Sequence, residues 1–418
     1  MPRRTTLALA LAAVPALAAC SGGDADADAP LGPVRYHPVP GCEALDHTPC
    51  DIREATCQQR MLEIAACVRG SEAGRLPPVA LMSKTAYAAY LEEQLAAEEP
   101  RPDPDHLERG LALLQLAAPG ALSPSATIER SVDWVGGFYR FETRDIVIVD
   151  PGEPMNAPIM NALLVHEMVH VLQHRDVDLV AYYEQPATDD ASLAAAAVVE
   201  GEGRLHEARA LASFVGIRPE EVDWVDYDRA AIDNANAWAL EQPSPYLVSY
   251  AAVAYAYGAR FVRAVWEADG LEGVRALFAD PPDSTLALFA SAEAEPPPPP
   301  REPAPPSAAP GWAPQSEIVL GAWGTFVLLS LGAGTDAAHP VASAWRGDRL
   351  FVYGGDDSSG GEPETAVVWK VELSDAASAA AAATIVSELL PDANVELTGA
   401  ALVVAAASGG ATFDDWTL

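Results

Sequence analysis

Apolar residues recur at helical spacing along much of the chain. The clearest run begins after the helix-start signal Asn156-Ala157-Pro158, beyond which apolar residues return every three or four positions. The run ends near residue 172 and contains the candidate chemistry described below. The same period predicts further helices at residues 51–69, 83–97, 105–117, 189–215 and 245–269.

Short apolar runs bounded by turn residues predict strands. Val79–Met82 is one, and the runs at 137–141 and 146–149 flank a turn, which indicates a hairpin. Later strands are expected at 325–331, 349–353, 366–373 and 395–406, with an alanine-rich helix after Asp375. The pattern predicts an α+β fold. Its last part is a small α+β module, for which a ferredoxin-like arrangement is one option.

Composition divides the chain into distinct parts. Residues 1–20 form a leader in which Arg3 and Arg4 precede an apolar stretch too short to span a membrane. Residues 21–35 form a flexible tether, and the Pro-rich residues 291–315 form a stiff linker. The remaining parts are a Cys-rich segment, a main domain and the small module, at residues 36–75, 76–290 and 316–418.

The leader ends in Leu17-Ala18-Ala19-Cys20, which resembles the bacterial lipobox. In that pattern the cysteine becomes the acylated N-terminus after cleavage, and a following serine, here Ser21, favours the outer membrane. The resemblance implies a cell-envelope protein attached to the membrane through a lipid on Cys20. An ordinary signal peptide with an incidental cysteine is the alternative.

Four further cysteines, Cys42, Cys50, Cys57 and Cys67, lie in a short window after the leader. An even number of cysteines in an exported chain predicts disulfides, here two with three possible pairings. A zinc site made of four cysteines is a weaker interpretation, because their spacings contain no C-x-x-C pair.

The net negative charge of the chain argues against one class of binding partner. The 418 residues carry a formal net charge of −35 at pH 7, and no basic patch interrupts the acidic sequence. Binding to nucleic acid requires Lys and Arg side chains that neutralise phosphates, so the composition argues against this class of partner.

The candidate chemistry lies in His166-Glu167-Met168-Val169-His170. Residues four apart lie on one face of a helix, about 6 Å apart along its axis, so both imidazoles can reach one metal ion. Glu167 then lies beside the metal, where a general base can take a proton from a metal-bound water. H-E-x-x-H is the signature of zincins, so the expected cofactor is Zn²⁺. Two histidines on a buried helix without a metal are the alternative.

A zinc ion held by two histidines needs a third protein ligand and one open position. Glu200 is the predicted ligand, because Ala196, Ala197 and Gly203 nearby are small and allow its helix to approach the metal helix. Glu202 points about 200° away around the helix, so only one of the two glutamates can face the metal.

Other residues compete for roles at the same site. His206 is a fallback third ligand, whereas His174 lies about 12 Å from His166 along the helix axis, too far to share one ion. Tyr255 or Arg260 is the candidate that stabilises the oxyanion formed when a carbonyl is attacked. Packing in the core is the alternative role of the tyrosine.

H-E-x-x-H followed by Glu200-Gly201 on a downstream helix resembles the gluzincin class of zinc metallopeptidases, whose second-motif glutamate is the third ligand. More narrowly, residues 75–290 resemble a group of uncharacterised bacterial metallopeptidase-like proteins, with a weaker similarity near the C-terminus. After Thr285 the chain departs from that group. The residues that carry the resemblance are 137–139, 146–149, 166–173, 199–202, Tyr255, Gly258, Phe261, Val262 and 281–285.

The resemblance implies a zincin-like fold in which the hairpin supplies an edge strand for an extended peptide. The leading hypothesis is zinc-dependent hydrolysis of a peptide or protein substrate, with Glu167 as general base. The alternative is a catalytically silent lipoprotein that serves as a binding or envelope-scaffold module, which the departure after Thr285 leaves open. A purely structural zinc is less favoured, because Glu167 would then have no role.

Overall fold

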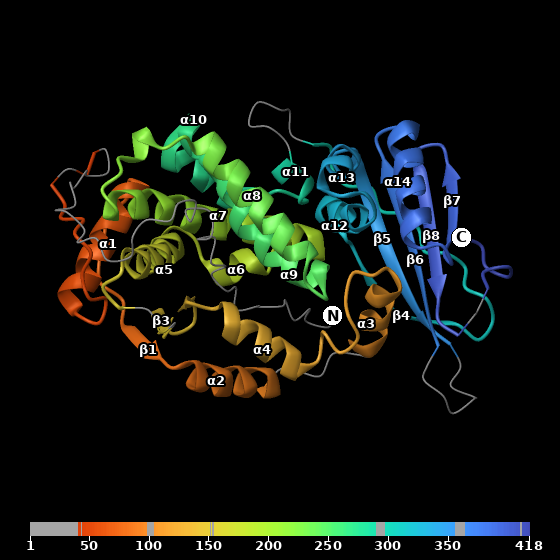
Figure 1. Ribbon diagram of the computed structural model, residues 1–418, viewed down its shortest axis with the longest axis horizontal. Helices are drawn as coiled ribbons and strands as arrows, with labels where there is room; N and C mark the ends of the chain where they lie inside the picture. Colours follow the sequence, from red (N-terminus) through yellow and green to blue (C-terminus); the bar gives the residue numbers. More distant parts are fainter. Residues whose placement is uncertain are drawn as a thin grey trace, which may run out of the picture.

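The computed structural model describes residues 41–42, 44–97, 104–150, 152, 154–289, 297–355, 364–409 and 412–418. Within them the chain has the predicted α+β fold, with a helical body at one end of the long axis and a five-stranded sheet at the other (Figure 1). Cys20, the leader and the tether lie outside the described residues. No helix in the described ranges has the length and hydrophobicity needed to cross a membrane.

The body consists mainly of helices. They are α1 (Ala55–Arg69), α2 (Lys84–Ala97), α3 (Pro104–Leu113), α4 (Pro124–Trp134), α5 (Pro158–Asp176), α6 (Leu179–Tyr183), α7 (Asp189–Phe214), the short η2 (Pro219–Glu221), α8 (Trp224–Leu240), α9 (Pro245–Ala252), the π-helical turn η3 (Val253–Tyr257), α10 (Gly258–Ala279) and α11 (Leu286–Phe289).

Helices α5 and α7 pack against each other at the centre of the body. Every residue of α5 from Met160 to Gln173 is buried, as expected for a helix that is apolar on most of its surface. Helix α7 is rich in alanine and glycine, so neighbouring helices approach its backbone closely. A Cβ atom at Gly201 would clash with the backbone of Gly258, where α10 begins.

The body carries a three-stranded sheet of β1 (Val79–Met82), β3 (Asp145–Val149) and β2 (Gly137–Arg140), in that order. Strand β1 is parallel to β3, and β2 pairs with β3 in the predicted antiparallel hairpin, with Gly137 opposite Ile148. Strand β3 is buried in the centre. Strand β2 is therefore an outer strand of this sheet.

The C-terminal module is an antiparallel sheet in the order β4-β5-β6-β8-β7. Its strands and helices are β4 (Ala313–Ile318), α12 (Gly321–Ala333), α13 (Thr335–Ala342), β5 (Trp345–Gly354), β6 (Thr365–Leu373), α14 (Ala376–Leu389), β7 (Asn394–Thr398) and β8 (Ala401–Ala407). The ferredoxin-like option is wrong, because β4 lies at the edge and pairs with β5, whereas the first strand of that fold lies inside the sheet.

The strand predicted at 325–331 is also wrong, because these residues lie in α12. They form a continuous apolar run, which a buried helix and a buried strand share. Helix α12 packs against α13, α14 and β5, and its residues from Gly321 to Ser330 are all buried.

One hydrophobic core runs through the body and the C-terminal module. It contains Leu111 just before α3 ends, Tyr257 of η3, Phe289 of α11, Trp323 of α12 and Val352 of β5. The predicted linker at 291–315 also overlaps the start of β4 at Ala313. The two parts are therefore joined by packing as well as by the chain between them.

A buried hydrogen-bond group lies at this junction. Asp190 at the start of α7 accepts hydrogen bonds from the backbone N–H and the hydroxyl of Thr285. The hydroxyl oxygen of Thr285 accepts the backbone N–H of Trp323 at 2.9 Å, and the indole of Trp323 donates to Ser249 at 2.9 Å. These bonds link α7 to α12 through Thr285.

We expect Asp190 to make stability depend on pH. Burial raises the pKa of its carboxyl from 3.8 to about 8, so between these values the folded chain holds a proton that the unfolded chain releases. The contribution of Asp190 to stability should therefore be full at and below the lower value and fall as pH rises toward the upper one, by at most about 1.4 kcal/mol per pH unit. Urea denaturation at a series of pH values measures this slope.

Asp190→Asn provides the comparison, because asparagine has no proton to lose. Subtracting its denaturation profile from that of the wild type isolates the contribution of Asp190 from those of the other carboxylates. Two parallel profiles would show that Asp190 ionises in the folded and unfolded chain alike.

The N-terminal segment is held by the two expected disulfides, and the structure selects one pairing. Cys42 is bonded to Cys67 and Cys50 to Cys57, with sequence separations of 25 and 7 residues. The longer link fastens the last turn of α1 to the residues before it, and the shorter one closes the loop at its start.

Loss of the longer disulfide should cost more stability than loss of the shorter one. Chain-entropy arguments give about 3.5 kcal/mol for the Cys42–Cys67 loop and about 2.4 kcal/mol for the Cys50–Cys57 loop. Paired Cys→Ser variants, compared by denaturant titration, test this order. A larger loss from the shorter loop would show that local strain or packing outweighs chain entropy.

Candidate metal centre

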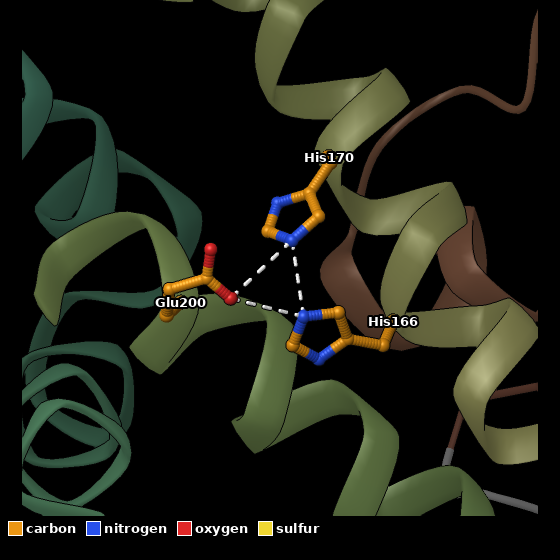
Figure 2. A group of neighbouring side chains, drawn as sticks. All are labelled: His166, His170 and Glu200. Carbon is orange, nitrogen blue, oxygen red and sulfur yellow. Dashed lines mark hydrogen bonds and ion pairs between the residues drawn. The ribbon is translucent and has the colours of Figure 1, made fainter. Parts of the chain in front are cut away.

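Helices α5 and α7 bring His166, His170 and Glu200 together (Figure 2). The Nε2 atoms of the two histidines are 3.0 Å apart, and Glu200 Oε2 lies 3.2 Å from His166 Nε2 and 3.5 Å from His170 Nε2. Ligand atoms around a tetrahedral zinc, with bonds of about 2 Å, are about 3.3 Å apart. The three predicted ligand residues therefore have the spacing that such an ion requires.

The outer nitrogen of each imidazole faces an acceptor. His166 Nδ1 lies 3.0 Å from Glu207 Oε2, and His170 Nδ1 lies 2.8 Å from Gln173 Oε1. The amide of Gln173 can be oriented in one way only, because its NH₂ group donates to Val199 O and to Glu202, which are both acceptors. Both imidazoles thus carry a proton on Nδ1.

Two neutral imidazoles protonated on Nδ1 would point two Nε2 lone pairs at each other across 3.0 Å. A cation between them, beside the Glu200 carboxylate, removes this repulsion. The carboxylates of the site also favour a proton on the histidines, just as they would favour a metal cation. Burial opposes a positive charge on His166, but the hydrogen bonds to Glu200 and Glu207 prevail and raise its pKa to about 10.

Small residues on α7 make room for the histidines. A Cβ atom at Gly203 would lie 2.6 Å from His166 Cε1, so this position has to be glycine for the ring to keep its place. The prediction that small residues near Glu200 allow a close approach is confirmed at this residue. Glu202 points away from the three ligand atoms, toward Arg69 and Gln173.

Glu167 lies beside the three residues and is 2% exposed. Its Oε2 atom is buried and has no hydrogen-bond partner among the residues that the structure describes. A Cβ atom at Gly137, the first residue of β2, would lie 3.3 Å from its Oε1. Burial raises the pKa of the Glu167 carboxyl to about 7, although both histidines act in the opposite direction.

Tyr255, in the π-helical turn η3, also lies at this site. Its ring is 5.9 Å from that of His166. Burial and the negative charges of Glu200 and Glu167 raise the pKa of its hydroxyl well above the usual value, and this hydroxyl is hydrogen-bonded to Glu200. The hydroxyl therefore keeps its proton at neutral pH.

The structure places the competing candidates elsewhere. Arg260 donates to the carbonyl of Leu288 at 2.5 Å, and His174 Nδ1 lies 3.2 Å from the Tyr139 hydroxyl. His206 is buried behind Glu202, with 4.0 Å between its Nε2 and the nearer carboxylate oxygen.

Sequence reasoning missed the residues that hold the ligands in place. Glu207 lies two helical turns after Glu200 and is bonded to Arg204 as well as to His166. Gln173 follows His170 by three positions, so helical spacing alone could have placed both side chains near the site. No local signal points to Arg69, which reaches the site from α1.

Comparison with known proteins adds a family match in one part of the chain. Residues 312–415 match a family described as a domain of unknown function (DUF8575). The match covers the C-terminal module and not the candidate metal centre. No curated protein and no solved structure matches the chain.

Proposed function

We propose that the protein is a zinc-dependent peptidase of the cell envelope. The observation that carries the proposal is the arrangement of His166, His170 and Glu200, in which both imidazoles direct their Nε2 atoms toward one point beside a carboxylate. The buried oxygen of Glu167 beside them, which has no hydrogen-bond partner among the described residues, adds a base to this set. Neither feature has an evident purpose in a core without a metal, because buried polar groups are costly unless they are paired.

His166, His170 and Glu200 would hold the zinc. When bound, zinc acts as a Lewis acid and lowers the pKa of a coordinated water to about 7. Glu167 takes the proton of the attacking water and delivers it to the leaving amine, so the peptide bond is cleaved with one water consumed. The protonated hydroxyl of Tyr255, which is bonded to Glu200 in the structure, would give up that bond and donate to the oxyanion that forms at the attacked carbonyl.

Strand β2 would orient the substrate. It is an outer strand of its sheet, and Gly137 at its start lies next to Glu167. An extended peptide that pairs with the main chain of β2 would present its carbonyl groups to the site. Such main-chain pairing depends little on the side chains of the peptide. The substrate class that fits is an unfolded or extended segment of polypeptide.

A second candidate is a catalytically silent protein that keeps the zincin-like arrangement as a binding or scaffold module. One observation favours it: His166, His170 and Glu200 are only 2%, 6% and 5% exposed, so a substrate carbonyl has little room to reach them. The departure of the segment after Thr285 from the resembled group leaves this candidate open. Residues 286–289 form α11, and Phe289 packs on Trp323 and Phe326.

Metal analysis together with a peptide-library assay separates these candidates. A peptidase should carry about one zinc per chain and cleave some members of the library, and a chelator should abolish this cleavage reversibly. A protein that holds zinc and cleaves nothing would support the scaffold. A protein that binds no zinc would refute the proposed site.

We also propose attachment to the membrane through a lipid on Cys20, as the lipobox resemblance implies. Cys20→Ala should move the protein from the membrane fraction to the soluble fraction or block its processing. A correctly processed Cys20→Ala protein that stays with the membrane would show that another anchor exists.

A further inference from the structure

We propose that Arg69, the last residue of α1, positions the ligand His170 through Glu202 and Gln173. This role rests on the proposed metal site, but it concerns a residue about a hundred positions away from His170 in the sequence. Arg69 contacts none of the three candidate ligands in the bonds described for it, so it acts as a positioning residue and not in the chemistry.

A continuous chain of buried hydrogen bonds joins Arg69 to the ligand. Arg69 Nε donates to Glu202 Oε1 at 2.8 Å, and Glu202 Oε2 accepts the amide of Gln173 at 2.9 Å. Gln173 Oε1 in turn accepts the Nδ1–H of His170 at 2.8 Å. The side chains of Arg69 and Glu202 are 1% and 0% exposed, so water does not compete for these bonds.

This series of hydrogen bonds controls which nitrogen of His170 carries the proton. If the amide of Gln173 flipped, its NH₂ group would face His170 Nδ1, and the ring proton would have to move to Nε2. A protonated Nε2 cannot bind a metal. Glu202 and the carbonyl of Val199 oppose the flip because both only accept hydrogen bonds, and Arg69 compensates the charge of the fully buried Glu202 carboxylate.

The position of Arg69 is itself secured at two points. Its second nitrogen donates to Asp176 at the end of α5, at 2.8 Å. Two residues earlier, Cys67 is joined to Cys42, so the last turn of α1 is covalently fastened. The disulfide-bonded segment therefore stabilises the end of helix α5, which carries the candidate ligands, through the bond between Arg69 and Asp176.

The test compares Arg69→Met with Arg275→Met. Both substitutions remove an arginine that is bonded to Asp176, but Arg275 is 40% exposed and has no described bond to Glu202. Loss of a residue that orients a ligand typically weakens metal affinity by 10- to 100-fold. We expect this loss of zinc affinity in Arg69→Met, together with an altered visible spectrum of the cobalt-substituted protein, and affinity close to wild type in Arg275→Met.

A second readout does not require any metal. Nitrogen chemical shifts of the His170 ring in the metal-free protein, at a pH where the ring is neutral, should report the Nδ1–H form in wild type and a mixture of both forms in Arg69→Met. If wild type binds no zinc but its His170 responds in this way, the positioning role stands and the proposed function fails. If a folded Arg69→Met matches wild type in ring form and zinc affinity, the positioning role is refuted.

If Arg69→Met does not fold, Arg69→Lys takes its place in the experiment. Lysine keeps the charge but cannot reach Glu202 and Asp176 with two fixed nitrogens. Its zinc affinity and its population of the Nδ1–H form should fall between those of wild type and of a protein that lacks the arginine. A folded Arg69→Lys protein with both properties unchanged would overturn the proposal.

Discussion

Glu167→Gln should lower the rate of peptide cleavage by about 100- to 10,000-fold, the range typical for loss of a general base. Glutamine has nearly the shape of glutamate but cannot accept the proton of the attacking water. The side chain lies beside the metal ligands and is almost fully buried, so the substitution replaces a costly buried carboxyl by a neutral group. Zinc content and folding should therefore be unchanged, and stability should be equal or higher.

Glu142→Gln is the matched control for this variant. Glu142 lies in the turn between β2 and β3 and is exposed, so the same chemical change there should leave cleavage as it is in wild type. Equal cleavage by wild type and Glu167→Gln would contradict the proposed mechanism. If neither protein cleaves any peptide while both bind zinc, the scaffold function is supported instead.

The part of the site that was predictable depends on local geometry. His166 and His170 are four residues apart on one helix, so their shared face follows from helical spacing alone. Glu200 was predicted from its small neighbours, and the contact between Gly203 and His166 bears out that reasoning. The hairpin beside the site followed from two apolar runs around a turn.

What could not be predicted depends on contacts between distant segments. Arg69 meets Glu202 across 133 positions, and nothing in the sequence near either residue marks the pair. The strand expected at 325–331 is a helix because an unbroken apolar run carries no period that distinguishes the two. The shared core likewise arises from packing between α12 and the body, which composition does not reveal.

His170→Ala and Glu200→Ala should each reduce bound zinc from about one ion per chain to near zero after dialysis. Each substitution removes one of three protein ligands, and the two that remain cannot complete a site of the usual kind for zinc. Metal analysis of the dialysed proteins measures the loss. Because zinc binds only the folded chain, these variants should also lose the stabilisation that added zinc gives wild type.

Two nearby residues provide the controls that make this result specific. His174 lies one helical turn beyond His170 and is bonded to Tyr139, so His174→Ala should keep its zinc. Glu202→Gln removes the other glutamate of the second motif, which faces Gln173 and Arg69. It should weaken zinc binding by about 10- to 100-fold without abolishing it, because it disturbs an outer contact and not a ligand. Full zinc retention in His170→Ala, or a greater loss in Glu202→Gln than in Glu200→Ala, would show that the ligand set is different.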